Sequence, residues 1–133
     1  MFATNKKALL LLEAIKEHEG WSPPCEDNNF KGSRSYRQHN PGNLRRSPFA
    51  FSYVDNFAVF ISDEVGNTAL LWDIYQKATG NTVTSLNGTS TIRELITVYA
   101  PPSDDNNTEA YINMIVVSTG MKETTTLAEI FEL

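Results

Sequence analysis

The chain has 133 residues, of which 41% are hydrophobic and 20% are charged, an ordinary balance for one globular domain. We therefore expect a single domain over residues 1–133, acting as a monomer. The formal net charge of −5 argues against a general nucleic-acid-binding protein, which needs a basic surface to replace the counterions of the polymer. The lone Cys25 has no partner for an internal disulfide, so packing alone must hold the fold.

The N-terminal segment looks like the start of a signal peptide but is too short for one. Lys6 and Lys7 precede the apolar run of residues 8–12, and Glu13 ends that run. A signal-peptide core needs ~7–15 apolar residues, and a membrane-spanning helix needs ~20. We therefore expect synthesis in the cytoplasm without a signal peptide, and no insertion into a membrane.

The first half of the chain is expected to hold one helix, a long loop and one β-hairpin. Apolar residues at helical spacing predict a helix over residues 5–18, with Gly20 supplying a left-handed stop. The segment 21–48 is rich in Pro, Asn, Ser, Gly and Arg, and a loop this long is usually functional or mobile. Two β-rich runs, 51–54 and 57–61, are joined by Asp55 and Asn56 and predict a tight hairpin.

The second half is expected to be helical. Ser62 or Asp63 caps a helix that reaches residue 79. Residues 91–94 form a capping box that opens an amphipathic helix, residues 106–109 form a box-like start for a helix to 118, and residues 126–129 open a short last turn. The predicted fold class is α+β, mostly helical with one small β-hairpin.

Glu19 is the carboxylate that stands out on the first helix. At ~100° per residue, the apolar stripe of that helix contains Ala8, Leu12 and Ile15, and Glu19 falls on the same stripe. Glu17 lies on the opposite side and is expected to face water. Burial and the negative end of the helix dipole both disfavour a carboxylate anion, so we expect the pKa of Glu19 to be raised. A carboxyl group that stays protonated near neutral pH is suited to protonating a glycosidic oxygen.

Four short motifs occur in an order that resembles a known superfamily. They are Glu19-Gly-Trp, Asn40-Pro-Gly-Asn-Leu-Arg45, Phe57-x-x-Phe with Gly66-x-x-Ala-Leu, and Tyr99-Ala-Pro with Asn106-x-Thr-x-x-Tyr-Ile112. The pattern resembles phage and bacterial lysozyme-like domains related to goose-type lysozymes, lytic transglycosylases and flagellar-type glucosaminidases. The likeness runs from about residue 9 to residue 120. It implies a lysozyme-like fold and cleavage of the β-1,4 link between the amino sugars of peptidoglycan.

The resemblance also implies roles for particular residues. Glu19 would be the catalytic acid and base, Asn40 and Asn43 would line the groove near the scissile bond, Tyr99 would face the N-acetyl sugar, and Tyr111 would support the same wall. The alternative for the two asparagines is a simple turn, and for Tyr99 a place in the core. Arg37 and Arg45 belong to a basic cluster over residues 31–46, which either contacts an anionic polymer or is solvated loop charge.

The reaction type stays open between hydrolase and lytic transglycosylase. A hydrolase usually pairs two carboxylates, and no motif chooses among Asp27, Asp55 and Asp63. The transglycosylases that the chain resembles use one Glu, with the N-acetyl group of the substrate as the nucleophile, and the resemblance therefore favours a mechanism with one acid. We expect no metal, since residues 104–107 lack the spacing of a calcium loop, and no cofactor.

The expected partner is the glycan strand of peptidoglycan, with no nucleic acid. The protein would act at the bacterial cell wall as a phage or prophage lysin, after membrane permeabilisation or as a virion component. The alternative is a catalytically silent lysozyme-like module that binds glycan or forms part of a virion or secretion apparatus.

Overall fold

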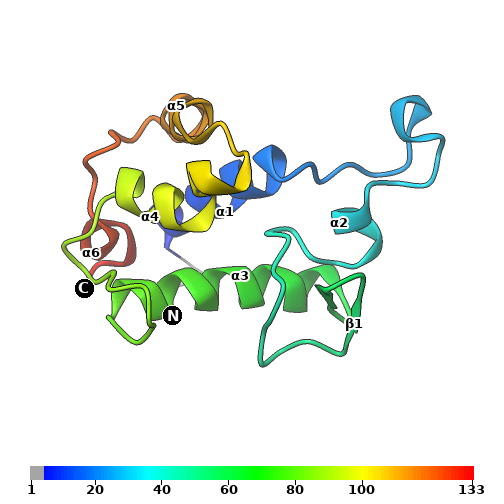
Figure 1. Cartoon of the computed structure of the whole chain (residues 1–133), viewed down its shortest axis with the longest axis horizontal. Coiled ribbons are helices and arrows are strands. Elements are labelled where there is room, and N and C mark those ends of the chain that lie inside the picture. Colours follow the sequence, from blue (N-terminus) through cyan, green and yellow to red (C-terminus); the bar gives the residue numbers. More distant parts are fainter. Residues whose placement is uncertain (1–4) are drawn as a thin grey trace. The chain divides into compact units, whose positions relative to one another are not determined.

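The computed structural model describes residues 5–133, and their contacts group into two compact units. The hairpin unit comprises residues 15–73, and the helical unit comprises residues 5–14 and 74–133. The boundaries fall inside α1 (Lys6–His18) and α3 (Asp63–Ala78), so each unit holds part of both helices (Figure 1). Residues 5–133 are mostly helical and include one two-stranded antiparallel sheet, which confirms the predicted α+β fold class. The expectation of one domain stays a prediction, because the contacts divide the described residues into two units.

Helix α1 ends in the left-handed turn that Gly20 was predicted to supply. Gly20 has a φ of +88°, and its N–H donates to the carbonyl oxygen of Glu17 at 3.1 Å. The N–H of Trp21 donates to the carbonyl oxygen of Lys16, also at 3.1 Å. This pair of bonds is a Schellman motif, in which Glu19 is the capping residue and Gly20 follows it. The predicted apolar stripe is buried, including Ala8 and Ile15 at 0% exposure.

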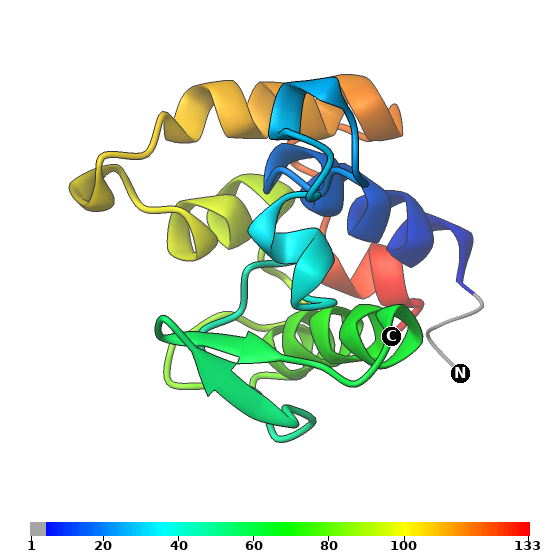
Figure 2. The same cartoon turned by 90° about the vertical axis from the view of Figure 1, so that its right-hand side faces the viewer.

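The hairpin forms as predicted, although its strands are shorter. β1 (Ser52–Val54) pairs antiparallel with β2 (Phe57–Val59) (Figure 2). In the register of the pair, Tyr53 lies opposite Ala58. Asp55 and Asn56 have φ angles of 53° and 67°, as a type I′ turn requires of both central residues. Ala58 is fully buried, whereas all of β1 is exposed, so β1 is the outer strand.

The segment predicted as a long loop contains two short helices. A 3₁₀ turn covers Glu26–Asn28, and α2 covers Arg34–Arg37. The hydroxyl of Ser33 accepts a hydrogen bond from the N–H of Tyr36 and caps α2. A single helical turn carries no apolar periodicity, which is why the sequence pattern did not reveal it.

The helical unit follows its predicted caps closely. Its elements are α4 (Ile92–Tyr99), the 3₁₀ turn η3 (Pro102–Asp104), α5 (Thr108–Thr119) and α6 (Leu127–Phe131). Capping boxes open α4 at Thr91 and α6 at Thr126, as predicted. The start of α5 was predicted wrongly: Asn107, not Asn106, is the cap, and its side-chain oxygen accepts from the N–H of Ala110. With Asn107 as the cap, Glu109 lies at the second helical position, one residue short of the place a capping box needs, and it binds Arg93 instead.

Arg93 joins three parts of the helical unit. Its guanidinium, on α4, donates to both carboxylate oxygens of Glu109 at the start of α5, at 2.6 and 2.8 Å. It also donates to both oxygens of Glu123 in the segment before α6, at 2.9 and 3.0 Å. These bonds to Arg93 lower the pKa of both carboxyl groups below the usual value, and the carboxylates in turn raise the pKa of Arg93.

No helix among residues 5–133 is long and apolar enough to cross a membrane.

Candidate functional site

Glu19 lies at the end of α1 with its side chain half-buried. Its N–H still makes the helical bond to the carbonyl oxygen of Ile15, at 2.8 Å, so the helical path continues one residue past His18. Glu13 and Glu17 are exposed. The order of burial along α1 therefore confirms the helical-wheel prediction, in which Glu19 alone among these carboxylates continues the apolar stripe.

Asn43 reaches Glu19 through its side-chain amide. Its Nδ2 donates to Oε1 of Glu19 and to the backbone carbonyl oxygen of the same residue, both at 2.9 Å. A backbone carbonyl oxygen only accepts, so the amide nitrogen of Asn43 must face Glu19, and its orientation is fixed. Asn43 itself has a φ of 50°, a left-handed conformation that asparagine tolerates better than most residues. The interpretation of Asn43 as a residue that bonds only its own turn is therefore wrong.

The side chain of Asn40 bonds only backbone groups, which is close to the simple turn considered as the alternative for both asparagines. Its Nδ2 donates to the carbonyl oxygens of Leu44 and Ala58, and its Oδ1 accepts from the N–H of Leu44, each at 2.9 Å. The residue is 1% exposed. With its amide committed to the backbone and no surface exposed, Asn40 shapes the turn that carries Asn43. This corrects the expectation that Asn40 itself lines a groove.

Gly66 allows the turn to lie directly against α3. A Cβ atom at this position would be 1.8 Å from the carbonyl oxygen of His39, a distance that no side chain can occupy. The N–H of Phe60 donates to the carbonyl oxygen of Gln38, and the N–H of Ala58 donates to that of Leu44, which attaches the turn to β2 as well. The glycine of the Gly66-x-x-Ala-Leu motif thus has a structural cause, close packing, that the sequence alone did not show.

Trp21 follows the Schellman turn and packs on neighbours within the hairpin unit. Its ring makes an edge-to-face contact with Tyr36 on α2, with centroids 5.3 Å apart. The ammonium of Lys16 lies 4.4 Å from the Trp21 ring centroid. The sequence gave no sign of the contact between Trp21 and Tyr36, because α2 was not predicted.

Within the basic cluster over residues 31–46, three arginines stack on aromatic rings, whereas Arg37 does not. The guanidiniums of Arg34 and Arg45 lie 3.5 and 4.9 Å from the ring centroid of Phe57 on β2. That of Arg46 lies 5.2 Å from the ring centroid of Tyr53 on β1. Arg37 instead donates to the carbonyl oxygen of Gly32 at 2.7 Å. The structure therefore groups Arg45 with the hairpin and leaves Arg37 on α2.

The candidates for a second carboxylate have local structural roles or no distinguishing feature. Asp63 pairs with Nδ1 of His39 at 2.5 Å, and Asp55 occupies the hairpin turn. Asp27 is exposed in the 3₁₀ turn that follows Cys25. Cys25 is half-buried, with its sulfur 3.7 Å from the hydroxyl oxygen of Ser22.

Tyr99 and Tyr111 belong to the helical unit and contact each other. Their rings meet edge to face with centroids 6.5 Å apart. Tyr99 is half-buried at the end of α4, and Tyr111 is 2% exposed on α5. Tyr111 is thus a core residue whose ring packs on Tyr99, while Tyr99 keeps some exposed surface. Whether Tyr99 faces a sugar stays a prediction.

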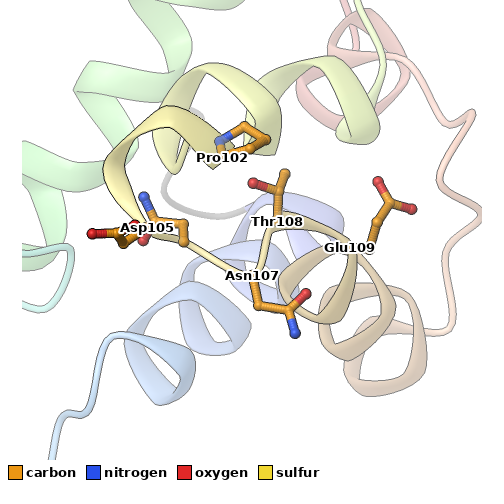
Figure 3. A pocket seen from close by; sticks show the side chains of 6 residues that line it. Pro102, Asp105, Asn107, Thr108 and Glu109 are labelled. Atoms are coloured by element: carbon orange, nitrogen blue, oxygen red, sulfur yellow. The ribbon is translucent and has the colours of Figure 1, made fainter.

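The helical unit also has an open hollow at the start of α5 (Figure 3). Most polar groups around it bond the chain nearby: Thr108 donates to the carbonyl oxygen of Ala100, Asn106 to that of Pro101, and Glu109 accepts from Arg93. The hollow is lined by Pro102, Asp105, Asn106, Asn107, Thr108 and Glu109. Because these groups serve the fold, we do not place the functional site here.

Among residues 5–133, no group of three or more His, Cys, Asp and Glu side chains is arranged to hold a metal ion.

Comparison of the chain with protein-family models, curated proteins and solved structures gives no match.

Proposed function

We propose that this protein is a peptidoglycan-cleaving enzyme, a muramidase or lytic transglycosylase of lysozyme-like type, in which Glu19 is the catalytic acid and base. The observation that carries the proposal is the double hydrogen bond from Asn43 to Glu19. It holds a half-buried carboxyl group in one orientation at the end of a helix, and it joins the first two motifs on which the lysozyme-like resemblance rests. A positioned carboxyl group of this kind is what general acid catalysis requires.

The contact with Asn43 distinguishes the two oxygens of Glu19. The amide nitrogen of Asn43 offers only hydrogens, so Oε1 accepts and the proton of the neutral acid resides on Oε2. In the proposed reaction, Oε2 transfers this proton to the glycosidic oxygen as the bond from that oxygen to the anomeric carbon breaks. The bonding electron pair stays with the leaving oxygen, and Glu19 becomes a carboxylate.

The second step uses a nucleophile that belongs to the substrate. The carbonyl oxygen of the neighbouring N-acetyl group attacks the anomeric carbon and forms a cyclic oxazolinium ion. Water or the C6 hydroxyl of the same sugar then attacks that carbon, whose bond to the acetyl oxygen breaks and restores the N-acetyl group, and the Glu19 carboxylate takes the proton released. The local roles of Asp55 and Asp63 support this route over one that needs a second carboxylate.

The products distinguish the two reactions. Purified peptidoglycan is incubated with the wild-type protein or with Glu19→Gln, and the soluble fragments are analysed by mass spectrometry. Reducing ends identify a hydrolase, and 1,6-anhydro ends identify a lytic transglycosylase. We expect one of these with the wild-type protein and neither with Glu19→Gln.

The competing proposal is a catalytically silent lysozyme-like module that binds glycan or forms part of a virion or secretion apparatus. The net charge of −5 favours it mildly, because cell walls are themselves anionic. If peptidoglycan stays intact when it is incubated with folded wild-type protein, the result supports the silent module and contradicts the enzyme. In either case the expected place of action is the bacterial cell wall.

A further inference from the structure

Two arginines of the hairpin unit lie against one aromatic ring. The guanidinium of Arg34, on α2, is 3.5 Å from the ring centroid of Phe57, and that of Arg45 is 4.9 Å from the same centroid. Their two Cζ atoms are therefore no farther apart than these two distances added together. We call Arg34 and Arg45 the arginine pair. Two positive charges this close repel each other unless an anion lies near both.

Arg46 does not belong to the arginine pair, because it lies on the other face of the hairpin. The register places Val54 opposite Phe57 and Tyr53 opposite Ala58. Successive side chains of a strand point to opposite faces, so the rings of Tyr53 and Phe57 lie on opposite faces. The guanidinium of Arg46 is the one that lies over Tyr53. Arg46 is therefore a neighbour with the same charge and the same kind of ring contact, but on a different face.

No carboxylate neutralises the arginine pair. Neither guanidinium lies within ion-pair distance of an Asp or Glu among residues 5–133, and neither makes a hydrogen bond to that part of the chain. Arg93 of the helical unit is the contrast, because its guanidinium binds two carboxylates. The arginine pair keeps both charges and its N–H groups for an acceptor that the described residues do not supply.

Arg34 is partly removed from water without an oxygen atom in the place of that water. Its Nε is buried and has no acceptor among the described residues. Such burial of a charged donor is costly, because the lost hydration is not replaced. The two Nη atoms of this half-buried residue also lack an acceptor there but are not buried, so they present N–H groups to solvent. An anion at the Nη atoms would offset the charge that burial leaves uncompensated.

The chemistry of the arginine pair matches a phosphate group. A phosphate monoester carries about −1.5 to −2 charge at pH 7 and three strong acceptor oxygens, which suits two guanidiniums, whereas a carboxylate carries one charge. Guanidinium edges bind phosphate oxygens through paired hydrogen bonds. A phosphorus atom held in this way lies about 4 Å from each Cζ, so one phosphate spans two Cζ atoms up to about 8 Å apart. This span is comparable to the largest separation that the two ring contacts allow.

We propose that Arg34 and Arg45 form a phosphate-binding site on the hairpin unit, in which the ring of Phe57 holds both guanidiniums and their outer N–H groups bind one phosphate group. Because the ring limits the freedom of both side chains, less entropy is lost when the anion binds. The ligand is free phosphate or the terminal phosphate of a small ester, which share the same doubly charged group. This inference goes beyond the proposed function and does not depend on it, because it uses no property of a glycan strand.

The test is a calorimetric titration of the wild-type protein with inorganic phosphate, at pH 7 and constant ionic strength. Dimethyl phosphate and acetate, which each carry a single charge, are titrated in parallel. We expect inorganic phosphate to bind about ten-fold more tightly than either, and to raise the melting temperature of the protein. Methyl phosphate then identifies the source of the ligand. Affinity equal to that of inorganic phosphate assigns the site to phosphate esters, and markedly weaker binding assigns it to the free ion.

Three variants locate the binding. Arg45→Gln, at an exposed position, should weaken phosphate binding by about ten-fold or more, because hydrogen bonds between charged groups are the strong ones. Arg34→Gln should have a similar effect. Arg46→Gln is the matched control, since it removes the same charge from the adjacent exposed residue on the other face, and it should stay within about two-fold of wild type. Thermal melts check folding, and if Arg34→Gln does not fold, the other two variants decide.

Several outcomes would overturn the phosphate site. One is the absence of saturable phosphate binding to folded wild-type protein. Another is an equal loss of affinity in Arg46→Gln and Arg45→Gln, which would indicate a general attraction of anions to the hairpin. A third is equal affinity for phosphate and acetate, which would contradict the assignment to a doubly charged ligand. None of these measurements uses lytic activity, so the failure of the proposed function and the failure of the phosphate site are separate results.

Discussion

The side-chain amide of Asn43 donates to both Oε1 and the backbone carbonyl oxygen of Glu19, each at 2.9 Å. One residue of the turn thereby fixes both the carboxyl group and the end of the helix that carries it. The bond to the backbone keeps Asn43 in place whatever the protonation state of the carboxyl group. Asn43 is therefore a positioning residue for Glu19 in the proposed reaction.

We predict that Asn43→Gly lowers wall-lytic activity by about ten- to a hundred-fold, because an unfixed carboxyl group spends less time in the reactive orientation. Glycine accepts the φ of 50° at this position, so the turn should persist. The measurement is the rate of peptidoglycan solubilisation beside a thermal melt. A folded Asn43→Gly protein with wild-type activity would show that Asn43 does not position Glu19.

We predict that Gly66→Ala destabilises the protein by about 1–3 kcal/mol, as expected for overpacking at a close contact. The added methyl group would meet the carbonyl oxygen of His39 at 1.8 Å, and the atom in the way is backbone. Denaturant unfolding measures the effect. Thr68→Ala, at an exposed position on α3, is the control and should stay within about 0.5 kcal/mol of wild type. Equal stability of Gly66→Ala and wild type would mean that the turn over residues 38–44 does not pack against α3.

We predict that the stabilising effect of Arg93 is lost in acid. The pKa values of Glu109 and Glu123 in the folded protein lie below the usual 4.5, so their pairing with Arg93 contributes fully above that pH and disappears as pH falls through the lowered values. Wild type should melt above Arg93→Gln at pH 7, and the difference should shrink steadily between pH 5 and pH 2. The difference should be modest, because these groups are solvent-exposed. A difference that grows in acid would contradict the sign of both shifts.

Local sequence signals predicted most of the elements. Gly20 stops α1, Asp55 and Asn56 make the hairpin turn, and the boxes at Thr91 and Thr126 open their helices. Each of these depends on a few neighbouring residues, so a pattern of three or four letters contains the information. The burial of Glu19 was predictable for the same reason, since one helix sets its direction.

The contacts that build the site depend on residues far apart in the chain, and the sequence pattern did not determine them. Asn43 bonds Glu19 across 24 positions, and Asn40 bonds Ala58 across 18. Two asparagines in one turn looked equivalent, and only the packing of β2 against that turn buries one and leaves the other directed at Glu19. The bond from Arg93 to Glu109, across 16 positions, was likewise not contained in the local pattern at the start of α5.

The last prediction concerns Glu19 itself. Glu19→Gln should reduce lytic activity by about 10²–10⁴-fold, because a side-chain amide has no acidic proton to give to the leaving oxygen. Folding should be retained. Glutamine has nearly the same shape, and its side-chain oxygen still accepts from the amide of Asn43 in place of Oε1. The rate of fragment release and the thermal melt are measured together on the same preparations.

Glu13→Gln and Glu17→Gln are matched controls on the same helix, since each removes one carboxylate from an exposed position. Both should keep activity within about two-fold of wild type, because surface substitutions away from a site change little. The comparison separates a chemical role from a general effect of charge on wall binding, because all three variants alter the net charge equally. An active Glu19→Gln protein, or a folded but inactive Glu17→Gln protein, would place the acid elsewhere and refute the proposed function of Glu19.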